Sequence, residues 1–169
     1  MGGMMETGTI WQIIFNTVWD EFSDVPDLER VTRISVRLLL AAILGGVLGF
    51  EREQKGKSAG LKTHMLVALG AALFVLVPQQ AGVTDADLTR VLQGLVAGIG
   101  FLGAGTIIKG NADEEVKGLT TAAGIWLTAA VGMASGMGRE ATAVLSTAIA
   151  LAILTTAPRI QPSFRRPKE

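Results

Sequence analysis

The sequence predicts an all-α, polytopic membrane protein with about five transmembrane helices and an N-terminal amphipathic helix in the membrane interface. Three observations support this fold class. Hydrophobic residues make up 49% of the 169 positions and charged residues only 18%, against roughly 25% charged residues in ordinary soluble domains. Several runs are almost free of charge and approach the roughly 20 apolar residues that a bilayer-spanning helix needs. An aromatic, amphipathic segment precedes these runs.

The N-terminal segment TIWQIIFNTVWDEF, residues 9–22, is predicted to be an interfacial helix. Its large apolar side chains recur at the spacing of one helix face, and polar side chains occupy the other face. Two tryptophans on such a face are typical of a helix in the headgroup layer, and packing against protein is the alternative. Pro26 then breaks the pattern, so we assign residues 1–33 to this helix and its linker. The apolar face comprises Trp11, Ile14, Phe15, Val18, Trp19 and Phe22.

Residues 34–157 contain the predicted transmembrane domain, and residues 158–169 form a short basic tail. The last apolar run, residues 119–157, is too long for one crossing. The sequence GMGRE places a turn and a charge pair in its middle, so we interpret the run as two helices. The five predicted crossings are residues 34–50, 61–78, 91–108, 119–137 and 139–157.

Basic residues predict the orientation, because positive charge is enriched on the cytoplasmic side of a membrane. With five crossings, the first connection, the third connection and the tail share one side and carry ten of the 15 basic residues. We therefore expect the N-terminus outside and the C-terminus in the cytoplasm. The ten are Arg52, Lys55, Lys57, Lys62, Lys109, Lys117, Arg159, Arg165, Arg166 and Lys168, and the other five are Arg30, Arg33, Arg37, Arg90 and Arg139. Arg37, near the outer end of its helix, is expected to snorkel outward.

Composition also excludes several function classes. The chain has no cysteine, which removes disulfides, thiolate metal sites and cysteine catalysis, and it has one histidine and no tyrosine. We find no catalytic constellation and expect a protein that is not an enzyme. The net charge is zero without a concentrated basic face, so no nucleic acid partner is expected.

The stretch GLVAGIGFLGAGTIIKG, residues 94–110, contains the spelling G-x-G-x-x-G of a dinucleotide-binding loop. That motif must follow a strand and open a helix, whereas here an unbroken apolar run passes through it. Close helix packing is the favoured interpretation, because small residues let backbones approach in lipid. A local break that exposes backbone groups to an ion is the alternative. The packing glycines are Gly94, Gly98, Gly100, Gly103 and Gly105, joined by Gly45 and Gly49 in the first crossing.

A polar stripe runs along the fourth predicted crossing, where Thr121, Thr128 and Ser135 recur at intervals of seven. One interpretation is that each hydroxyl bonds the carbonyl four residues earlier in its own helix. The other is a polar path or an interhelical seam.

Three stretches together resemble one family. They are GFEREQKGKSAGLKTHMLVALGAALF (residues 49–74), QGLVAGIGFLGAGTI (93–107) and VKGLTTAAGIWLTAAVGMASGMG (116–138). Their order and spacing are similar to the MgtC/SapB family of bacterial inner-membrane proteins. The resemblance implies a multi-pass protein of the cytoplasmic membrane linked to survival in low magnesium and, in intracellular pathogens, to virulence. Some members are described as restraining the ATP synthase, and others as magnesium transporters.

The chain departs from that family in places. Many members carry a soluble C-terminal domain, so we expect this chain to represent a short form. Some virulence members have Asn-Thr where this chain has Thr120 and Thr121, and Cys where it has Leu127. Virulence roles attached to those positions are therefore not transferred.

Ionisable residues flank the short first connection, and such residues near a bilayer are functional candidates by default. Glu51, Arg52 and Glu53 end the first crossing, and Lys62 and His64 begin the second. One interpretation is a structural clamp of ion pairs. The other is a cation or proton site, since Mg²⁺ takes one or two carboxylates and keeps several waters, which makes Glu51 and Glu53 metal candidates and magnesium the candidate cofactor. His64 could sense acid.

The favoured function is a regulatory or binding membrane protein in magnesium homeostasis and in adaptation to low magnesium or acid. The alternative is a transporter or channel for magnesium or protons. Membrane lipids and further copies of the chain, with a dimer favoured, are the expected partners. The family resemblance adds the ATP synthase.

Overall fold

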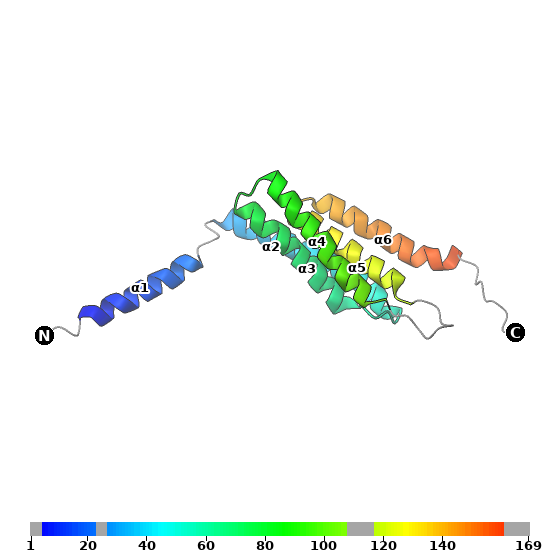
Figure 1. Ribbon diagram of the computed structural model, residues 1–169, viewed down its shortest axis with the longest axis horizontal. Coiled ribbons are helices and arrows are strands. Elements are labelled where there is room, and N and C mark those ends of the chain that lie inside the picture. Colours follow the sequence, from blue (N-terminus) through cyan, green and yellow to red (C-terminus); the bar gives the residue numbers. More distant parts are fainter. Residues whose placement is uncertain (1–4, 23–26, 108–116, 161–169) are drawn as a thin grey trace. The chain divides into compact units, whose positions relative to one another are not determined.

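The computed structural model describes residues 5–22, 27–107 and 117–160, which are almost entirely helical (Figure 1). The predicted all-α class is confirmed. The basic tail beyond residue 160 and most of the third predicted connection, residues 108–116, lie outside the described ranges. The helices are α1 (Met5–Glu21), α2 (Leu28–Gln54), α3 (Leu61–Gln80), α4 (Asp85–Gly105), α5 (Leu119–Gly136) and α6 (Glu140–Ile160).

Five of the described helices, α2 to α6, are long and apolar enough to cross a membrane, which confirms the multi-pass prediction. Two of them begin earlier than predicted. Helix α2 begins at Leu28 and α4 at Asp85, because hydropathy locates the apolar centre of a helix and misses polar first turns. Thr84 starts α4 by accepting a hydrogen bond from the Asp87 amide at 3.2 Å.

The chain divides into two compact units, Met1–Ser35 and Val36–Glu169. In the first unit, α1 carries large apolar side chains that are all exposed, and the rings of Phe15 and Trp19 stack with centroids 6.4 Å apart. The predicted helix therefore exists. Its position in the membrane interface stays a prediction.

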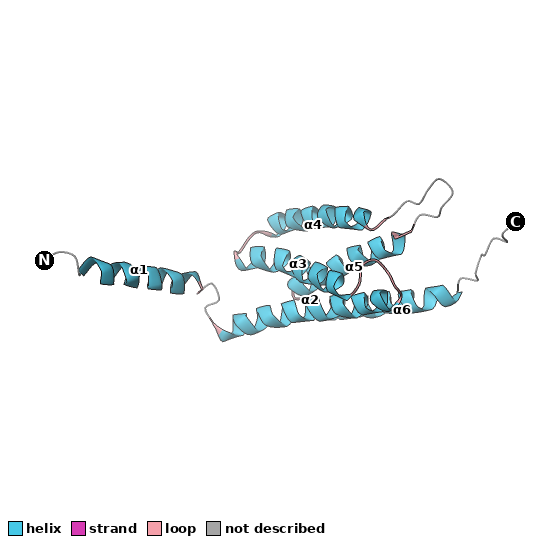
Figure 2. Cartoon of the chain, turned by 90° about the horizontal axis from the view of Figure 1, so that it is seen from below, coloured by secondary structure: helices cyan, strands magenta, loops and turns pink. Residues whose placement is uncertain are grey.

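In the second unit, α5 is the central helix and contacts α3, α4 and α6. Figure 2 shows α4 on one side of α3 and α5, with α2 and α6 on the other side. One buried cluster connects α5 to the pair α2 and α6. It consists of Leu44 of α2, Val131 of α5 and Ala143 of α6. Among the five candidate spans, α5 has the largest share of buried residues and α4 the smallest.

Glycine pairs bring α2 and α5 against the backbone of α3. A Cβ added at Gly45 would lie 2.6 Å from the His64 carbonyl oxygen, and one at Gly49 would lie 2.8 Å from the Gly60 carbonyl oxygen. On the α5 side, Gly132 and Gly136 are in close contact with the backbone of α3. Since no side chain lies between them, the backbones of α2 and α5 approach the backbone of α3 closely, as small residues allow in lipid.

Helix α4 differs from the predicted packing. Within this single chain, four of its five predicted packing glycines face open space, where an added Cβ would meet nothing within 4 Å, so close packing there stays a prediction that would need a second copy. Gly103 approaches a neighbour, at 3.6 Å from the Cβ of Ala122. The helix is also continuous, so the alternative of a local break does not hold. The four open positions are Gly94, Gly98, Gly100 and Gly105.

The ends of α2 and α5, like that of α3 at Gly82, are fixed by glycines in the left-handed region. Gly56 (φ 63°) follows α2 and Gly138 (φ 73°) follows α5. The amide of Lys57 bonds the carbonyl of Arg52 at 3.0 Å, and the amide of Arg139 bonds that of Ala134 at 2.8 Å. These are Schellman ends, which reverse the chain while satisfying the last carbonyls of the helix.

Candidate functional site

The connection between α2 and α3 sets the position of the predicted polar residues. The Glu53 carboxylate accepts a hydrogen bond from the Leu61 amide at 2.7 Å. Gly60, at the N-cap of α3, has no side chain to cap the helix, so Glu53 supplies the cap from the preceding helix. The end of α2 is thereby held beside the start of α3.

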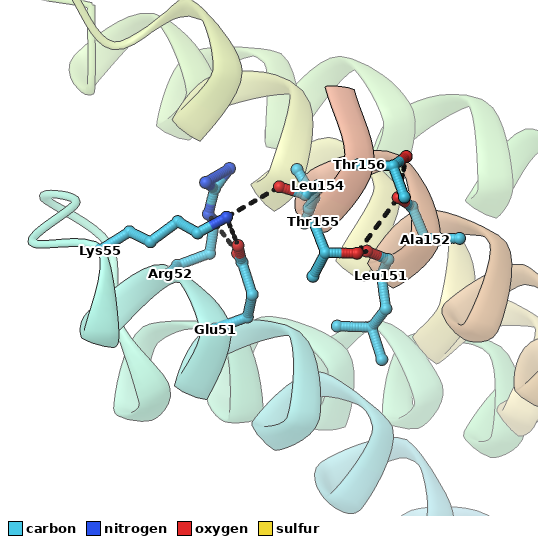
Figure 3. Close-up of polar contacts among 8 residues, drawn as sticks. All are labelled: Glu51, Arg52, Lys55, Leu151, Ala152, Leu154, Thr155 and Thr156. Atoms are coloured by element: carbon cyan, nitrogen blue, oxygen red, sulfur yellow. Dashed lines mark hydrogen bonds and ion pairs between the residues drawn. The ribbon is translucent and has the colours of Figure 1, made fainter. Parts of the chain in front are cut away.

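The "α2-end cluster" consists of Glu51, Arg52 and Lys55 and lies at this boundary (Figure 3). Arg52 Nε lies 2.9 Å from one Glu51 carboxylate oxygen, and Lys55 Nζ lies 2.6 Å from the other. Glu51 and Arg52 are buried, whereas the Lys55 side chain is 38% exposed. The cluster is therefore a set of ion pairs at the edge of the bundle.

Lys55 also ties α2 to α6. Its Nζ donates a hydrogen bond to the carbonyl oxygen of Leu154 at 2.8 Å, as Figure 3 shows. In a regular helix that carbonyl would accept from the amide of residue 158, but residue 158 is a proline and has no N–H. The ammonium group of Lys55 takes the place of the missing donor.

The hydrogen bonding of the cluster is incomplete. Although Arg52 and Lys55 contact Glu51 at ion-pair distance, both Glu51 oxygens, Arg52 Nε and Arg52 Nη1 are buried and make no hydrogen bond of acceptable geometry within the described residues. The formal charges are also unequal, with two cations against one carboxylate. One positive charge is therefore unbalanced within the cluster.

His64 is fully buried one turn into α3. Its Nδ1 lies 3.0 Å from the Gly60 carbonyl oxygen, which accepts only from a protonated nitrogen, so Nδ1 carries the proton. Nε2 is buried and has no partner among the described residues. It faces Gly124 of α5, where an added Cβ would lie 3.5 Å away.

A cavity of about 190 Å³, the "α5–α6 crevice", lies against these groups. Arg52, His64 and Thr120 occupy polar positions in its wall, and the remaining lining is apolar. The apolar lining comprises Leu48, Ala123, Gly124, Leu127, Ala150, Ile153 and Leu154.

The structure brings together only part of the predicted site. Glu51, Arg52 and His64 meet where α2 ends and α3 begins, as the sequence predicts, whereas Lys62 is exposed and forms no ion pair with the cluster within the described residues. Glu53 is exposed and caps α3, while Glu51 is buried and pairs with Arg52 and Lys55, so the role of the two carboxylates as metal ligands stays a prediction. Within the described residues no group of three or more His, Asp or Glu could hold a metal ion.

The polar stripe of α5 is buried in the bundle. Thr121, Thr128 and Ser135 are exposed by 3% or less. Ser135 bonds the Val131 carbonyl of its own helix at 3.1 Å, as one interpretation expects. The hydroxyl of Thr128 has no hydrogen-bond partner within the described residues.

Sequence reasoning missed a second clamp at the opposite end of the bundle. Arg37 does not simply snorkel outward: its Nη1 donates to the Gly136 carbonyl at 3.1 Å, and its Nε lies 3.7 Å from Glu140. Its guanidinium group also lies against Gly138, where an added Cβ would overlap Nη2 and force the arginine side chain to shift. The contact neutralises the end of α5 and binds it to α2 and α6. An arginine inside an apolar run is the one sequence signal that could have indicated it.

Comparison with known proteins gives consistent matches. The model of the MgtC family matches residues 38–162. SrpB of Synechococcus elongatus is 43% identical over 76% of this chain and 76% of its own length. YhiD of Escherichia coli, whose name describes a candidate magnesium transporter, is 42% identical over 70% of this chain and 58% of its own. Protein MgtC of Brucella abortus is 45% identical over 67% of this chain and 46% of its own. No solved structure matches the chain.

Proposed function

Because the chain belongs to the MgtC family, we propose that it is a regulatory or binding membrane protein of magnesium homeostasis that does not conduct ions. The name of YhiD supports the link to magnesium. The chain spans about half the length of the Brucella MgtC proteins, so the activities and partners of those longer proteins form part of the proposal.

The observation that carries the proposal is the closed seam between α3 and α5. Along this seam Gly132 and Gly136 press on the carbonyls of Ala68 and Ala72, which leaves no room for a side chain. The hydroxyl stripe is buried, and charged groups lie at the two ends of the bundle. A conducting path needs a continuous polar lining, and this packing supports a protein that binds without conducting.

A transporter remains the second candidate on one observation. Thr128 Oγ1 and His64 Nε2 are buried without partners in the described bundle, and such groups mark ion or proton pathways in membranes. A transporter would use them in an open state of the α3–α5 seam.

Magnesium flux into proteoliposomes separates the two candidates. The full chain, reconstituted with a magnesium-sensitive dye inside, should give the same flux as empty liposomes. A gene deletion should nevertheless impair growth in low magnesium, and the wild-type gene should restore it. Protein-dependent flux that is lost in Thr128→Val would contradict the regulatory proposal and favour the transporter.

Thermal unfolding tests whether magnesium binds the α2-end cluster. Glu51→Gln leaves the two cations of the cluster without their carboxylate, so it should lower the melting temperature. Because the cluster already carries excess positive charge, the loss should be equal with and without millimolar Mg²⁺. A magnesium-dependent stabilisation that disappears in Glu51→Gln would instead establish a cation site.

The proposed location is the bacterial cytoplasmic membrane, with the N-terminus outside and the C-terminus inside. A reporter that is active only in the cytoplasm should give signal when fused after Glu169 and none when inserted near Val83. The reverse pattern would overturn the orientation. The ATP synthase is a proposed partner from the family resemblance, and copurification from membranes at low magnesium is its test.

A further inference from the structure

The α2-end cluster and the α5–α6 crevice together have the properties of an anion site. Arg52 is 3% exposed; its Nε pairs with Glu51 at 2.9 Å, whereas its Nη1 is buried and has no hydrogen-bond partner among the described residues. Arg52 lines the crevice together with His64 and Thr120. Buried N–H groups without partners are costly, so an acceptor in the crevice would stabilise them.

The charge of the cluster indicates a ligand with one negative charge. Arg52 and Lys55 carry two positive charges, and Glu51 carries one negative charge. Glu53 does not correct the imbalance, since its carboxylate is exposed and bonds the Leu61 amide. A net charge at a membrane boundary is expensive. A monoanion would neutralise the cluster, whereas a divalent cation would worsen the imbalance.

The start of α5 adds to the same preference. Thr120 lies in the first turn of α5, and the N-cap residue Gly118 makes no side-chain hydrogen bond to the first amides. Helix N-termini with free amides favour anions. Thr120 in this first turn and Arg52 both line the crevice, so the positive end of the helix and the arginine favour the same ligand charge.

The shape of the crevice distinguishes a lipid from a small ion. The polar positions lie where α2 and α6 end and α3 and α5 begin, which is one face of the membrane. From there the crevice continues along Leu48, Leu127 and Ala150, whose side chains are apolar. A free phosphate would leave this wall empty, while a lipid would place its phosphate at Arg52 and part of an acyl chain against the wall.

We propose that the α5–α6 crevice binds an anionic lipid, whose phosphodiester monoanion pairs with Arg52 and Lys55 and whose chain covers the apolar wall. The site differs from the cation site considered for Glu51 and Glu53. It is also independent of whether the protein conducts or regulates.

Charge variants with opposite signs provide the test. Native mass spectrometry of the full chain in a neutral detergent would measure the affinity for phosphatidylglycerol, with phosphatidylcholine as the neutral reference. Lys55→Gln removes the excess charge and should weaken phosphatidylglycerol binding about fivefold, the factor for about 1 kcal/mol per charge at a membrane surface. Glu51→Gln doubles the excess charge and should strengthen binding about as much. Lys57→Gln is the matched control, because Lys57 is exposed and outside the cluster.

A second pair of variants tests the crevice without changing any charge. Ala123 lines the crevice and is exposed, so Ala123→Leu should fill it and remove saturable binding while preserving the fold. Ala148 is exposed on α6 outside the crevice, and Ala148→Leu should leave binding unchanged. Equal affinities in Lys55→Gln, Glu51→Gln and Lys57→Gln would overturn the proposal. Inorganic phosphate that binds with the same affinity as phosphatidylglycerol would overturn the assignment to a lipid.

Discussion

A single methyl group at Gly132 tests the packing of α5 against α3. The Cβ of Gly132→Ala would overlap the carbonyl oxygen of Ala68 and would lie 2.8 Å from its Cα and its carbonyl carbon. These are backbone atoms of a neighbouring helix, so no rotamer change can relieve the contact. Helix α5 would have to move away from α3 along its length.

The magnitude follows from comparison with an open glycine. Overpacking typically costs about 1–3 kcal/mol, whereas alanine in place of glycine gains roughly 1 kcal/mol of helix propensity. Gly100→Ala on α4 gains the same propensity and meets nothing within 4 Å. The difference between the two variants isolates the packing term, and we expect Gly132→Ala to be less stable by about 1–3 kcal/mol.

Thermal unfolding in detergent, followed by tryptophan fluorescence and by helical circular dichroism, measures this difference. Each kcal/mol shifts the midpoint by roughly 2–4 °C in a domain of this size. Gly132→Ala should therefore melt about 2–12 °C below Gly100→Ala. A midpoint at or above that of Gly100→Ala would refute the close approach of the two backbones.

Three further predictions concern the clamps and α4. Arg52→Ala removes one of the two ion pairs of the buried Glu51, leaves Lys55 as its partner, and should cost about 1–3 kcal/mol of unfolding free energy. Lys57→Ala, at an exposed position, should stay within about 0.5 kcal/mol, and equal denaturation curves would contradict the cluster. Arg37→Met loses the Gly136 carbonyl contact and should destabilise by about 1–3 kcal/mol, against about 0.5 kcal/mol or less for the exposed Arg33→Met, as measured by chemical unfolding. Gly98→Leu should leave the unfolding midpoint of the monomer unchanged and lower the oligomer fraction measured by cross-linking. An unchanged oligomer fraction would exclude this face of α4 as a dimer contact.

The candidate site was predictable where its residues are close in sequence. Glu51 and Arg52 are adjacent, and the short connection brings His64 beside them, so their meeting follows from chain length alone. Lys62 was included for the same reason, but it stands two residues before the buried His64, about 200° away around the helix, and lies on the exposed side of α3. Proximity in sequence does not decide the face of a helix that a side chain occupies.

Both long-range clamps escaped prediction for one physical reason. Lys55 bonds Leu154, and Arg37 bonds Gly136, across separations of 99 residues in each case. Their acceptors are backbone carbonyls, which every residue has, so no side-chain pattern marks them. Pro158 does remove the donor that would have satisfied Leu154, but the sequence does not say which lysine replaces it.

The sequence by itself determined the helices and the number of crossings, because burial of apolar side chains in lipid and satisfaction of the backbone are properties of each segment alone. Only the tertiary structure decided which glycines pack. Gly45 and Gly132 lie against α3, while Gly98 and Gly100 face open space, although all four stand in similar apolar surroundings in the sequence. In lipid, helices associate through shape and close contact rather than through apolarity, so a glycine acts in packing only where the fold brings another backbone to it.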